Sequence, residues 1–304
     1  MAGRLLRIEE LSSTALADLD KEKTAIFIPI SPIEGHGSHL PLGVDFFNAE
    51  FFAEKAARIS IEKRPDFDAV VCRGIPLGTQ LYKQPGSLRI DGVTLYKIMT
   101  SVGASLAIWG YRYIFILSGH GSPKDIVALE AACRKVSRRF SIRMHNLSGA
   151  MAIRFLSGEF TERISANLSR PLTDEERALL KKDTHGGWWE TSMMLYLRPE
   201  LVDEQYRSLP DTEKGSKNPE PGYYGSPSRA SKEFAEVSTR VMVEEAGQVI
   251  ARCLGGEDVT AETTSPLYRI IFLRPGFQKY LILSAVSGII VVTAIWIIST
   301  AIFR

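Results

Sequence analysis

The sequence predicts an α/β domain with a largely parallel sheet between helices, followed by one C-terminal transmembrane helix. Two patterns support the α/β domain. Short apolar runs alternate with longer segments of helical apolar spacing, and glycine-rich polar loops follow some of the runs. The final apolar segment, residues 281–303, holds 23 residues without a charge and supports the transmembrane helix.

Each predicted element has a local signal. The run AIFIPI at residues 25–30 is typical of a buried strand, and YIFIL at residues 113–117 is another. Gly110 ends one helical segment, and Pro123 suits the first turn of the next. We expect a short helix and a turn within residues 1–24 and an irregular loop at 207–232. The predicted strands are at 25–30, 69–77, 113–117 and 142–147. The predicted helices are at 46–61, 93–110, 123–140, from 188 onward, and at 231–253.

Composition limits the class of protein. Lys and Arg number 37 and Asp and Glu 35 among 304 residues, so the net charge of +2 argues against a nucleic-acid binder that works by bulk charge. Hydrophobic residues make up 45% of the chain, which is enough for a sizeable core. The three cysteines are far apart, which argues against a disulfide framework or a zinc ribbon and fits a reducing compartment.

The C-terminal segment predicts a membrane location. A helix of this length spans roughly 34 Å, whereas the apolar core of a bilayer is about 30 Å thick. Basic residues are concentrated just before the segment, and the N-terminus has no apolar run typical of a signal peptide. We therefore expect a single-pass, tail-anchored protein that contacts membrane lipid, with its folded part facing the cytoplasm. The predicted domains are a main domain at 1–255, a juxtamembrane connector at 256–280 and the span at 281–303.

Four of the five histidines lie in three glycine-containing loops, two of which also carry carboxylates. The first two loops follow predicted parallel strands, so we expect them to converge on the carboxyl edge of the sheet, where α/β proteins place their sites. A lone histidine in a loop is more often structural, but four histidines in three such loops favour a functional site. The residues of interest are Glu34, His36, His39 and Asp45 in the first loop, His120 in the second, and Asp183, His185 and Glu190 in the third.

The chemistry of these side chains indicates a metal site. Histidine and carboxylate groups without cysteine suit Zn²⁺, Mn²⁺ or Fe²⁺ rather than a structural thiolate site. Glu34 and His36 alternate along an extended segment, so both can reach one pair of ions. Asp45 has two oxygens and can bridge two ions about 3.5–4 Å apart, as in two-metal hydrolases.

The first loop resembles the creatininase (creatinine amidohydrolase) family, whose hallmark is Glu-x-His-Gly-x-His-Leu-Pro-Leu-Gly-x-Asp. The chain matches every fixed position of this motif from Glu34 to Asp45. Supporting matches to other family motifs follow in the family's order, so the resemblance covers about residues 20–255. They lie at residues 84–88, 119–121, 185–192 and 222–230.

The resemblance implies a three-layer α/β/α sandwich and a hydrolase that cleaves a C–N amide bond with water activated by two divalent ions, Zn, Mn or Fe. It also implies possible roles for single residues. We expect Glu34, Asp45 and His120 to hold one ion, His36 and Asp45 to hold the second, and His185 to transfer a proton to the leaving nitrogen. Apart from the resemblance, Trp188 and Trp189 can line a substrate pocket, since aromatic rings stack on amide rings, or one of the two can belong to the core. Ser122 is a further candidate for substrate contact.

One departure from the family affects the second ion. Creatininase supplies a glutamate two residues after the histidine that corresponds to His120, whereas this chain has Ser122. Glu190 can compensate as a ligand, or it can fix the start of the helix at that loop. The alternative is a catalytically impaired module that binds a ligand or a partner.

For the enzyme, cyclic amides, formamides and short peptides all stay open as small-molecule substrates, and the resemblance implies a homo-oligomer.

Overall fold

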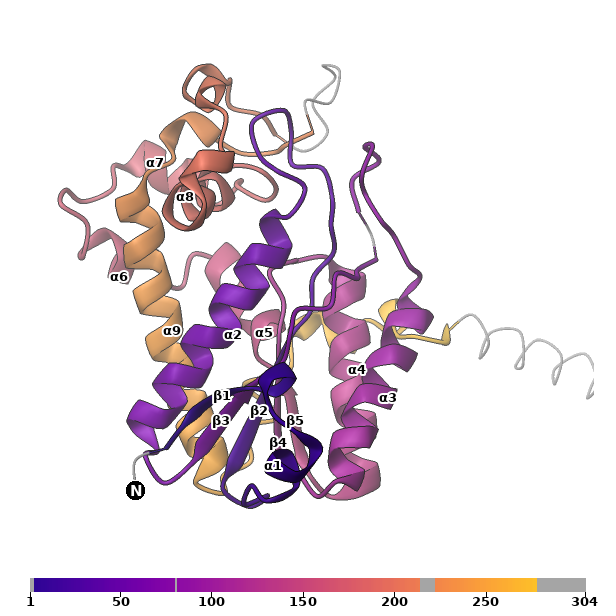
Figure 1. Ribbon diagram of the computed structural model, residues 1–304. Helices are drawn as coiled ribbons and strands as arrows, with labels where there is room; N and C mark the ends of the chain where they lie inside the picture. The colour runs from indigo at the N-terminus through magenta and orange to yellow at the C-terminus, as the bar shows by residue number, and fades with distance from the viewer. Residues whose placement is uncertain (1–2, 80, 214–221, 278–304) are drawn as a thin grey trace, which may run out of the picture.

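A single parallel sheet lies at the centre of the protein (Figure 1). The computed structural model describes residues 3–79, 81–213 and 222–277. Within these residues the strand order is β1-β3-β2-β4-β5, and every neighbouring pair is parallel. The strands are β1 (Leu5–Arg7), β2 (Thr24–Pro29), β3 (Asp68–Val71), β4 (Tyr113–Leu117) and β5 (Arg143–Asn146).

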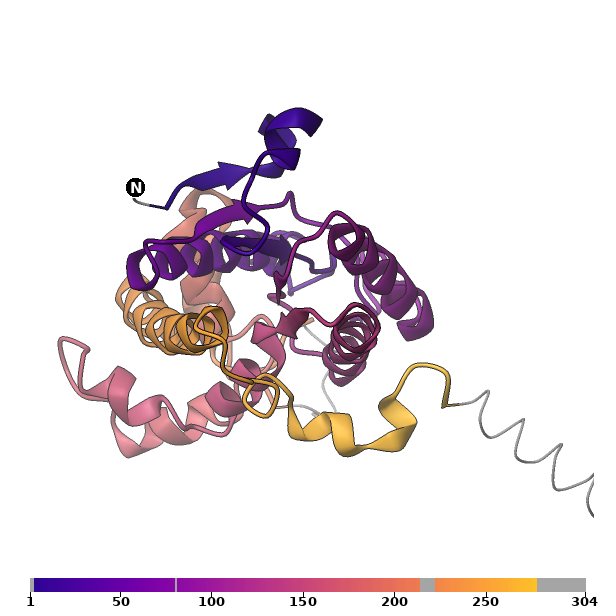
Figure 2. The same ribbon diagram turned by 90° about the horizontal axis from the view of Figure 1, so that it is seen from below.

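Helices cover both faces of the sheet (Figure 2). Helices α3 and α4 lie on one face, and α2 and α9 lie on the other. Helices α6, α7 and α8 pack against α9 beyond the edge of the sheet through a separate apolar cluster. The helices are α1 (Ser13–Ala17), α2 (Val44–Lys63), α3 (Gly92–Ile108), α4 (Pro123–Phe140), α5 (Leu147–Leu156), α6 (Thr161–Ser165), α7 (Asp174–Leu180), α8 (Trp188–Leu197) and α9 (Lys232–Leu254).

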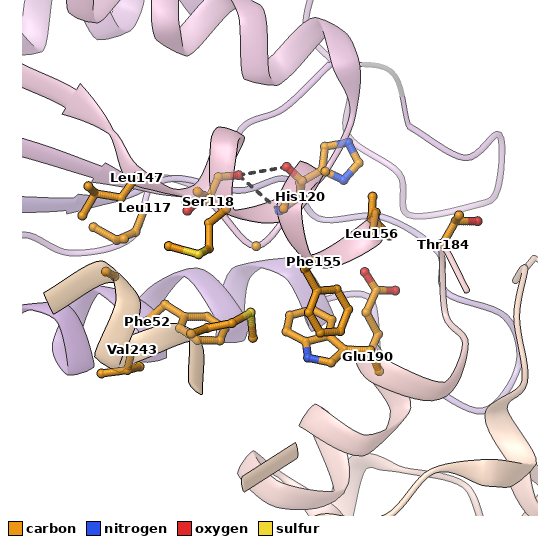
Figure 3. Close-up of a pocket in the computed structure, with 18 of the residues that line it drawn as sticks. Phe52, Leu117, Ser118, His120, Leu147, Phe155, Leu156, Thr184, Glu190 and Val243 are labelled. Atoms are coloured by element: carbon orange, nitrogen blue, oxygen red, sulfur yellow. Dashed lines mark hydrogen bonds between the residues drawn. The ribbon is translucent and has the colours of Figure 1, made fainter. Parts of the chain in front are cut away.

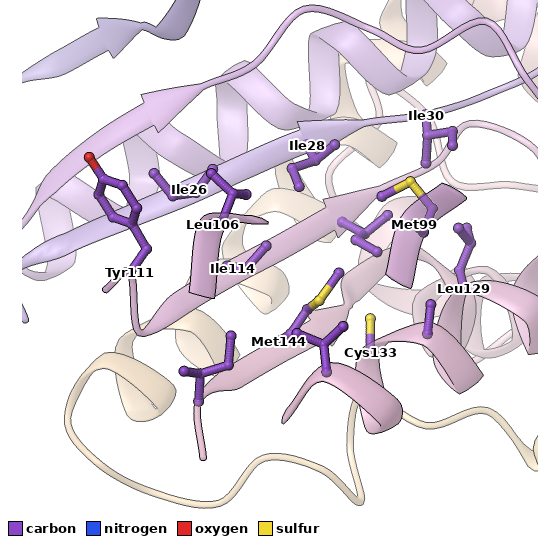
Figure 4. Close-up of a cluster of buried hydrophobic side chains, with 14 of the residues drawn as sticks. Ile26, Ile28, Ile30, Met99, Leu106, Tyr111, Ile114, Leu129, Cys133 and Met144 are labelled. Carbon is purple, nitrogen blue, oxygen red and sulfur yellow. The ribbon is translucent and has the colours of Figure 1, made fainter. Parts of the chain in front are cut away.

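The alternation of side chains along β2 explains the two layers. Successive residues of a strand point to opposite faces of the sheet. Ile26 and Ile28 accordingly join the cluster under α3 and α4, which Figure 4 shows, whereas Ala25 and Phe27 pack under α2 and α9. All six residues of β2 are buried, as expected for the central strand of a parallel sheet that is covered on both faces.

The topology also determines where the polar loops lie. Strands β2 and β4 are neighbours, with Pro29 paired with Leu117 at their carboxyl ends. The loop after β2 and the loop after β4 therefore leave the sheet side by side. Ser122 then begins α4 as its N-cap, with its hydroxyl oxygen accepting a hydrogen bond from the Asp125 backbone N–H at 3.3 Å.

The predicted α/β fold with a parallel sheet is confirmed, with three differences. Residues 1–24 contribute an edge strand, β1, in addition to the expected short helix. Strand β3 is shorter than predicted, because only Asp68–Val71 pairs in the sheet. Residues 147–180, for which no element was predicted, contain α5, α6 and α7.

The predicted transmembrane helix at 281–303 lies outside the described residues. Among the residues that the structure describes, no helix is both long and apolar enough to cross a membrane. We therefore correct the prediction of a tail-anchored membrane location, with its cytoplasmic orientation and lipid contact.

The described part of the predicted connector packs on the main domain instead of extending away from it. Val259 is fully buried in the cluster under α2 and α9. The carboxylate of Glu130 on α4 accepts hydrogen bonds from Ser265, from its backbone N–H at 2.8 Å and from its hydroxyl at 3.1 Å. The domain boundary at residue 255 stays a prediction.

Candidate metal centre

Three loops bring the predicted site residues together at the carboxyl edge of the sheet. The loop after β2 carries Glu34 and His36 and is closed by a hydrogen bond from the Glu34 N–H to the Leu42 carbonyl at 3.1 Å. Asp45 lies in the first turn of α2. The other contributions come from His120 after β4, from His185 in the loop before α8, and from Glu190 in the first turn of α8.

Asp45 lies between two imidazoles. Its Oδ1 is 3.4 Å from His36 Nε2, and its Oδ2 is 3.1 Å from His120 Nδ1. Each imidazole also faces a second carboxylate. Glu34 Oε1 is 3.0 Å from His120 Nδ1, and Glu190 Oε2 is 3.5 Å from His36 Nε2. The two oxygens of Asp45 thus belong to two adjacent groups of potential ligands.

These side chains form overlapping groups that could hold metal ions. In each group the potential ligand atoms lie within 4.8 Å of one another. Three such groups are found among the described residues: Glu34, Asp45 and His120; His36, Asp45 and Glu190; and Glu34, His36 and His185.

Contacts outside the groups orient two of the imidazoles, a hydrogen bond for His36 and an ion-pair contact for His120. A backbone carbonyl can only accept, so His36 Nδ1, 3.1 Å from the Glu34 carbonyl oxygen, carries the proton and leaves Nε2 facing the carboxylates. His120 has the reverse orientation. Its Nδ1 faces Glu34 and Asp45, and its Nε2 is 3.4 Å from the buried carboxylate of Asp125. Asp125 itself is fixed by the Thr79 N–H at 2.8 Å.

The site buries negative charge that no Lys or Arg of the described chain neutralises. Glu34 and Asp45 are no more than 1% exposed, and within the described chain neither forms an ion pair with Lys or Arg. Several buried ligand atoms have no hydrogen-bond partner among the described residues. These atoms are Glu34 Oε1, His36 Nε2 and both carboxylate oxygens of Asp45.

The pKa values reflect this charge. Burial favours neutral His36, but the carboxylates of Asp45 and Glu190 outweigh it and raise the pKa of His36 to about 9. Burial likewise opposes the charged form of Asp45, but His36 and His120 hold the pKa of Asp45 well below its usual range. Burial raises the pKa of Glu190 to about 8. Without another cation, the imidazoles are therefore the positive partners of the carboxylates.

His185 is held as a neutral imidazole at the edge of the site. Its Nε2 lies 2.8 Å from the Gly35 carbonyl oxygen and must carry the proton, so Nδ1 is an acceptor, 3.9 Å from Glu34 Oε1. Its ring stacks on Tyr82, with 4.8 Å between the ring centroids. Burial lowers the pKa of His185 to about 3. Backbone hydrogen bonds in both directions between His185 and Tyr224 attach this loop to the segment before α9.

The residues predicted to contact substrate take three different positions. Ser122 caps α4 and does not line the cavity beside the site. Trp188 is 4% exposed and packs on Phe234 in the cluster beneath α9. Trp189 lines the cavity. Of the remaining histidines, His39 contacts Thr191 and His145 contacts Thr263, and neither belongs to a candidate metal group in the described chain.

Two residues that support the site were not predicted from the sequence. Asp125 follows His120 by five residues, in the first turn of α4, and contacts the far side of its ring. A carboxylate so close to a predicted ligand is a signal that could have identified it. Tyr82 stacks on His185, and its backbone N–H donates to Glu34 Oε2 at 2.7 Å. No motif marks Tyr82, because its position depends on the path of the loop after β3.

Comparisons with known proteins agree with this architecture. The sequence profile of the creatininase family, described as creatinine amidohydrolase, matches residues 9–250. Creatinine amidohydrolase of Pseudomonas putida is 23% identical over 240 residues, which cover 72% of this chain and 85% of that protein. The mycofactocin precursor peptide peptidase of Mycobacterium tuberculosis (strain ATCC 25618 / H37Rv) is 30% identical over 119 residues, which cover 38% of this chain and 47% of the relative.

Solved structures show the same fold. A manganese creatininase superposes with a TM-score of 0.62 at 20% identity, covering 83% of this chain and 99% of that structure. A mutant creatininase of the Zn-Zn type gives a TM-score of 0.59 at 20% identity, with the same coverage. Manganese and zinc are thus the metals named in structures of this family.

The parallel α/β fold and the buried groups of imidazoles and carboxylates define a metal-dependent amidohydrolase, an enzyme that acts on C–N amide bonds. The chain belongs to the creatininase family, which matches about four-fifths of its length.

The loop after β4 offers a direct test of this packing. A Cβ at Gly119 would lie 2.3 Å from the Asp45 carbonyl oxygen, whereas one at Gly121 would meet nothing within 4 Å. We expect Gly119→Ala to lower the free energy of unfolding by about 1–3 kcal/mol, since backbone must move to relieve the overlap. We also expect it to weaken Mn²⁺ binding, because His120 moves with the loop. Urea unfolding and Mn²⁺ titration are the measurements, and Gly121→Ala is the control. Equal stability and affinity of the two variants would contradict this packing.

Proposed function

We propose that the protein hydrolyses a C–N amide bond at a centre of two divalent cations that share Asp45. The observation that carries this proposal is the position of Asp45, whose two carboxylate oxygens face His36 on one side and His120 on the other. One group would comprise Glu34, Asp45 and His120, and the second would comprise His36, Asp45 and Glu190.

The side chains fit such cations in charge and in geometry. Glu34 Oε1, His36 Nε2 and the Asp45 oxygens are buried without hydrogen-bond partners in the described chain, and buried carboxylates need a cation nearby. Imidazole and carboxylate ligands suit Zn²⁺ and Mn²⁺. The chemistry that such cations supply when bound is Lewis acidity, which acidifies water and polarises an amide carbonyl.

Within this proposal His185 moves the proton. The hydrogen bond from its Nε2–H to the Gly35 carbonyl leaves Nδ1 as the atom that faces the site. Water adds its oxygen to the amide carbon, and His185 Nδ1 accepts a proton from that water. The C–N bond breaks, and His185 returns the proton to the leaving nitrogen, so that the products are a carboxylic acid and an amine. Stacking on Tyr82 keeps the ring in place.

Glu190 supports the enzyme over the alternative, a non-catalytic binding module. That alternative depends on the loss of a carboxylate at Ser122. Glu190 Oε2 approaches His36 from α8 at 3.5 Å, and the same oxygen accepts a hydrogen bond from the Gly186 N–H at 2.5 Å. A carboxylate is therefore available on this side of the site without Ser122.

Turnover of a panel of cyclic amides, formamides and short peptides with Mn²⁺, Zn²⁺ or Fe²⁺ tests the proposed reaction. We expect hydrolysis of at least one amide that depends on added metal and disappears with a chelator. Metal binding without hydrolysis across the panel would favour the binding module. The homo-oligomer implied by the family resemblance stays a prediction that sedimentation can test.

Asp45→Asn should abolish binding of both ions and all hydrolysis. The substitution keeps the size of the side chain but removes the charge that two cations would share. Metal content by elemental analysis is the measurement, and Asp174→Asn, at a fully exposed carboxylate, is the control. Retention of two ions per chain in Asp45→Asn would contradict the shared carboxylate.

His185→Gln should keep both ions and lose most turnover. A general acid–base group contributes about 10²–10⁴-fold in rate, so we expect a loss of that size in kcat. Metal content and kcat are measured together, with His145→Gln, which lies outside the candidate metal groups of the described chain, as the control. Loss of metal in His185→Gln would instead assign His185 as a ligand, in the group that it forms with Glu34 and His36.

Asp125→Asn should weaken metal binding without unfolding the protein. Asp125 faces His120 Nε2 and so orients Nδ1 toward the site, and loss of such a carboxylate typically costs about 10–100-fold in metal affinity. The amide can still accept the Thr79 N–H, so the fold is retained. Mn²⁺ titration is the measurement, and Asp91→Asn, at the exposed N-cap of α3, is the control. Wild-type affinity in Asp125→Asn would remove it from the site.

A further inference from the structure

An apolar cavity opens directly beside the candidate metal centre (Figure 3). Its volume is about 140 Å³. His120 and Glu190 lie at one end, and His185 is also among the lining residues. The cavity then extends between β4, α2, α5 and α9. Figure 3 shows Leu117 and Leu147 on one side of this part and Phe52 and Val243 on the other.

The far part of the cavity carries no charge. Within the described chain no Lys or Arg lines it, and Figure 3 shows Phe52, Leu117, Leu147 and Val243 around this part. The lining residues with carboxylates are Asp183 and Glu190, and Glu190 belongs to the candidate metal centre. One of them, Asp183, is already engaged, because its carboxylate accepts hydrogen bonds from backbone N–H groups that include those of Trp188 and Trp189.

The size of the cavity limits what it can hold. An apolar cavity of about 150 Å³ inside a protein binds benzene, so a cavity of this volume holds one phenyl or branched aliphatic group. One wall is rigid. The ring of Trp189 stacks on Phe52 at 6.2 Å and contacts Phe155 at 5.6 Å. Such a wall presents a flat apolar surface to a ring or a branched chain.

We infer that the substrate carries an uncharged phenyl or branched aliphatic group next to the scissile amide, and that this cavity binds that group. The inference rests on the proposed function, since the amide must lie at the metal centre while the group lies in the cavity. A charged group of the same size would be buried among Leu117, Leu147 and Val243 without a partner, at a high cost in free energy.

Two matched series of amides test the inference with the Mn²⁺-loaded enzyme. The acyl series is acetamide, 3-methylbutanamide, phenylacetamide and glycinamide, and the amine series is the formamides of methylamine, isobutylamine, benzylamine and ethylenediamine. In at least one series we expect kcat/KM to be about 10–100-fold higher for the phenyl or branched compound than for the smallest one, as burial of such a group predicts. Equal rates, or a preference for the ammonium compounds, would overturn the inference.

Binding without turnover separates this inference from the proposed function. Two methionines, Met151 and Met242, line the cavity, whereas Met99 lies in the cluster on the other face of the sheet. With ¹³C-labelled methionine methyl groups, phenylacetamide or N-benzylformamide should shift the signals of Met151 and Met242 and leave Met99 unchanged. Shifts without hydrolysis of any amide would reject the proposed function and retain the cavity as a binding site. Absence of these shifts would overturn the inference even where hydrolysis occurs.

Two substitutions test whether the preference for a phenyl or branched group arises in the cavity. Ala246→Leu on α9 adds bulk to the lining and should reduce the preference for phenyl over the smallest compound by at least tenfold. Val243→Ala removes bulk and should move the preference toward larger rings. Ala251→Leu, on α9 but away from the cavity lining, is the control and should keep the wild-type preference. An unchanged preference in folded Ala246→Leu and Val243→Ala would place the apolar group elsewhere and overturn the inference.

Discussion

Buried negative charge is the constraint on which the site depends. Glu34 and Asp45 are almost completely removed from water, and within the described chain no Lys or Arg pairs with either of them. Ionised carboxylates in such a place are stable only beside positive charge. In the protein alone that charge is protonated His36 and His120, and divalent cations can replace those protons. A site that stabilises cations is therefore a consequence of how its carboxylates are buried.

The parallel sheet makes this burial possible. Because β2 and β4 are neighbours and parallel, their loops leave the same edge and bring His36 close to His120. Gly119 lets the second loop approach the start of α2 so closely that a larger residue would overlap the Asp45 backbone. The segment before α9 holds the loop of His185 in place, because the backbone of Tyr224 forms hydrogen bonds with the backbone of His185.

The parts of the fold and of the candidate site that could be predicted from the sequence are those determined by residues close together in the chain. The loop from Glu34 to Asp45 lies between strand β2 and helix α2 in one contiguous stretch of sequence, so the residue pattern was enough to predict all three. Trp188 and Trp189 were not separable, because adjacent residues at a helix start point in different directions that only the packing of α8 decides. Strand β1 was missed because three residues at a sheet edge carry almost no periodicity. The segment at 281–303 has a clear pattern, but it lies outside the described residues.

The central claim is that Asp45 joins two groups of ligands, and anomalous X-ray scattering from crystals of the Mn²⁺-loaded protein tests it most directly. This account predicts two anomalous peaks that share the Asp45 carboxylate, one beside Glu34 and His120 and the other beside His36 and Glu190. A single peak, or two peaks of which only one contacts Asp45, would contradict it.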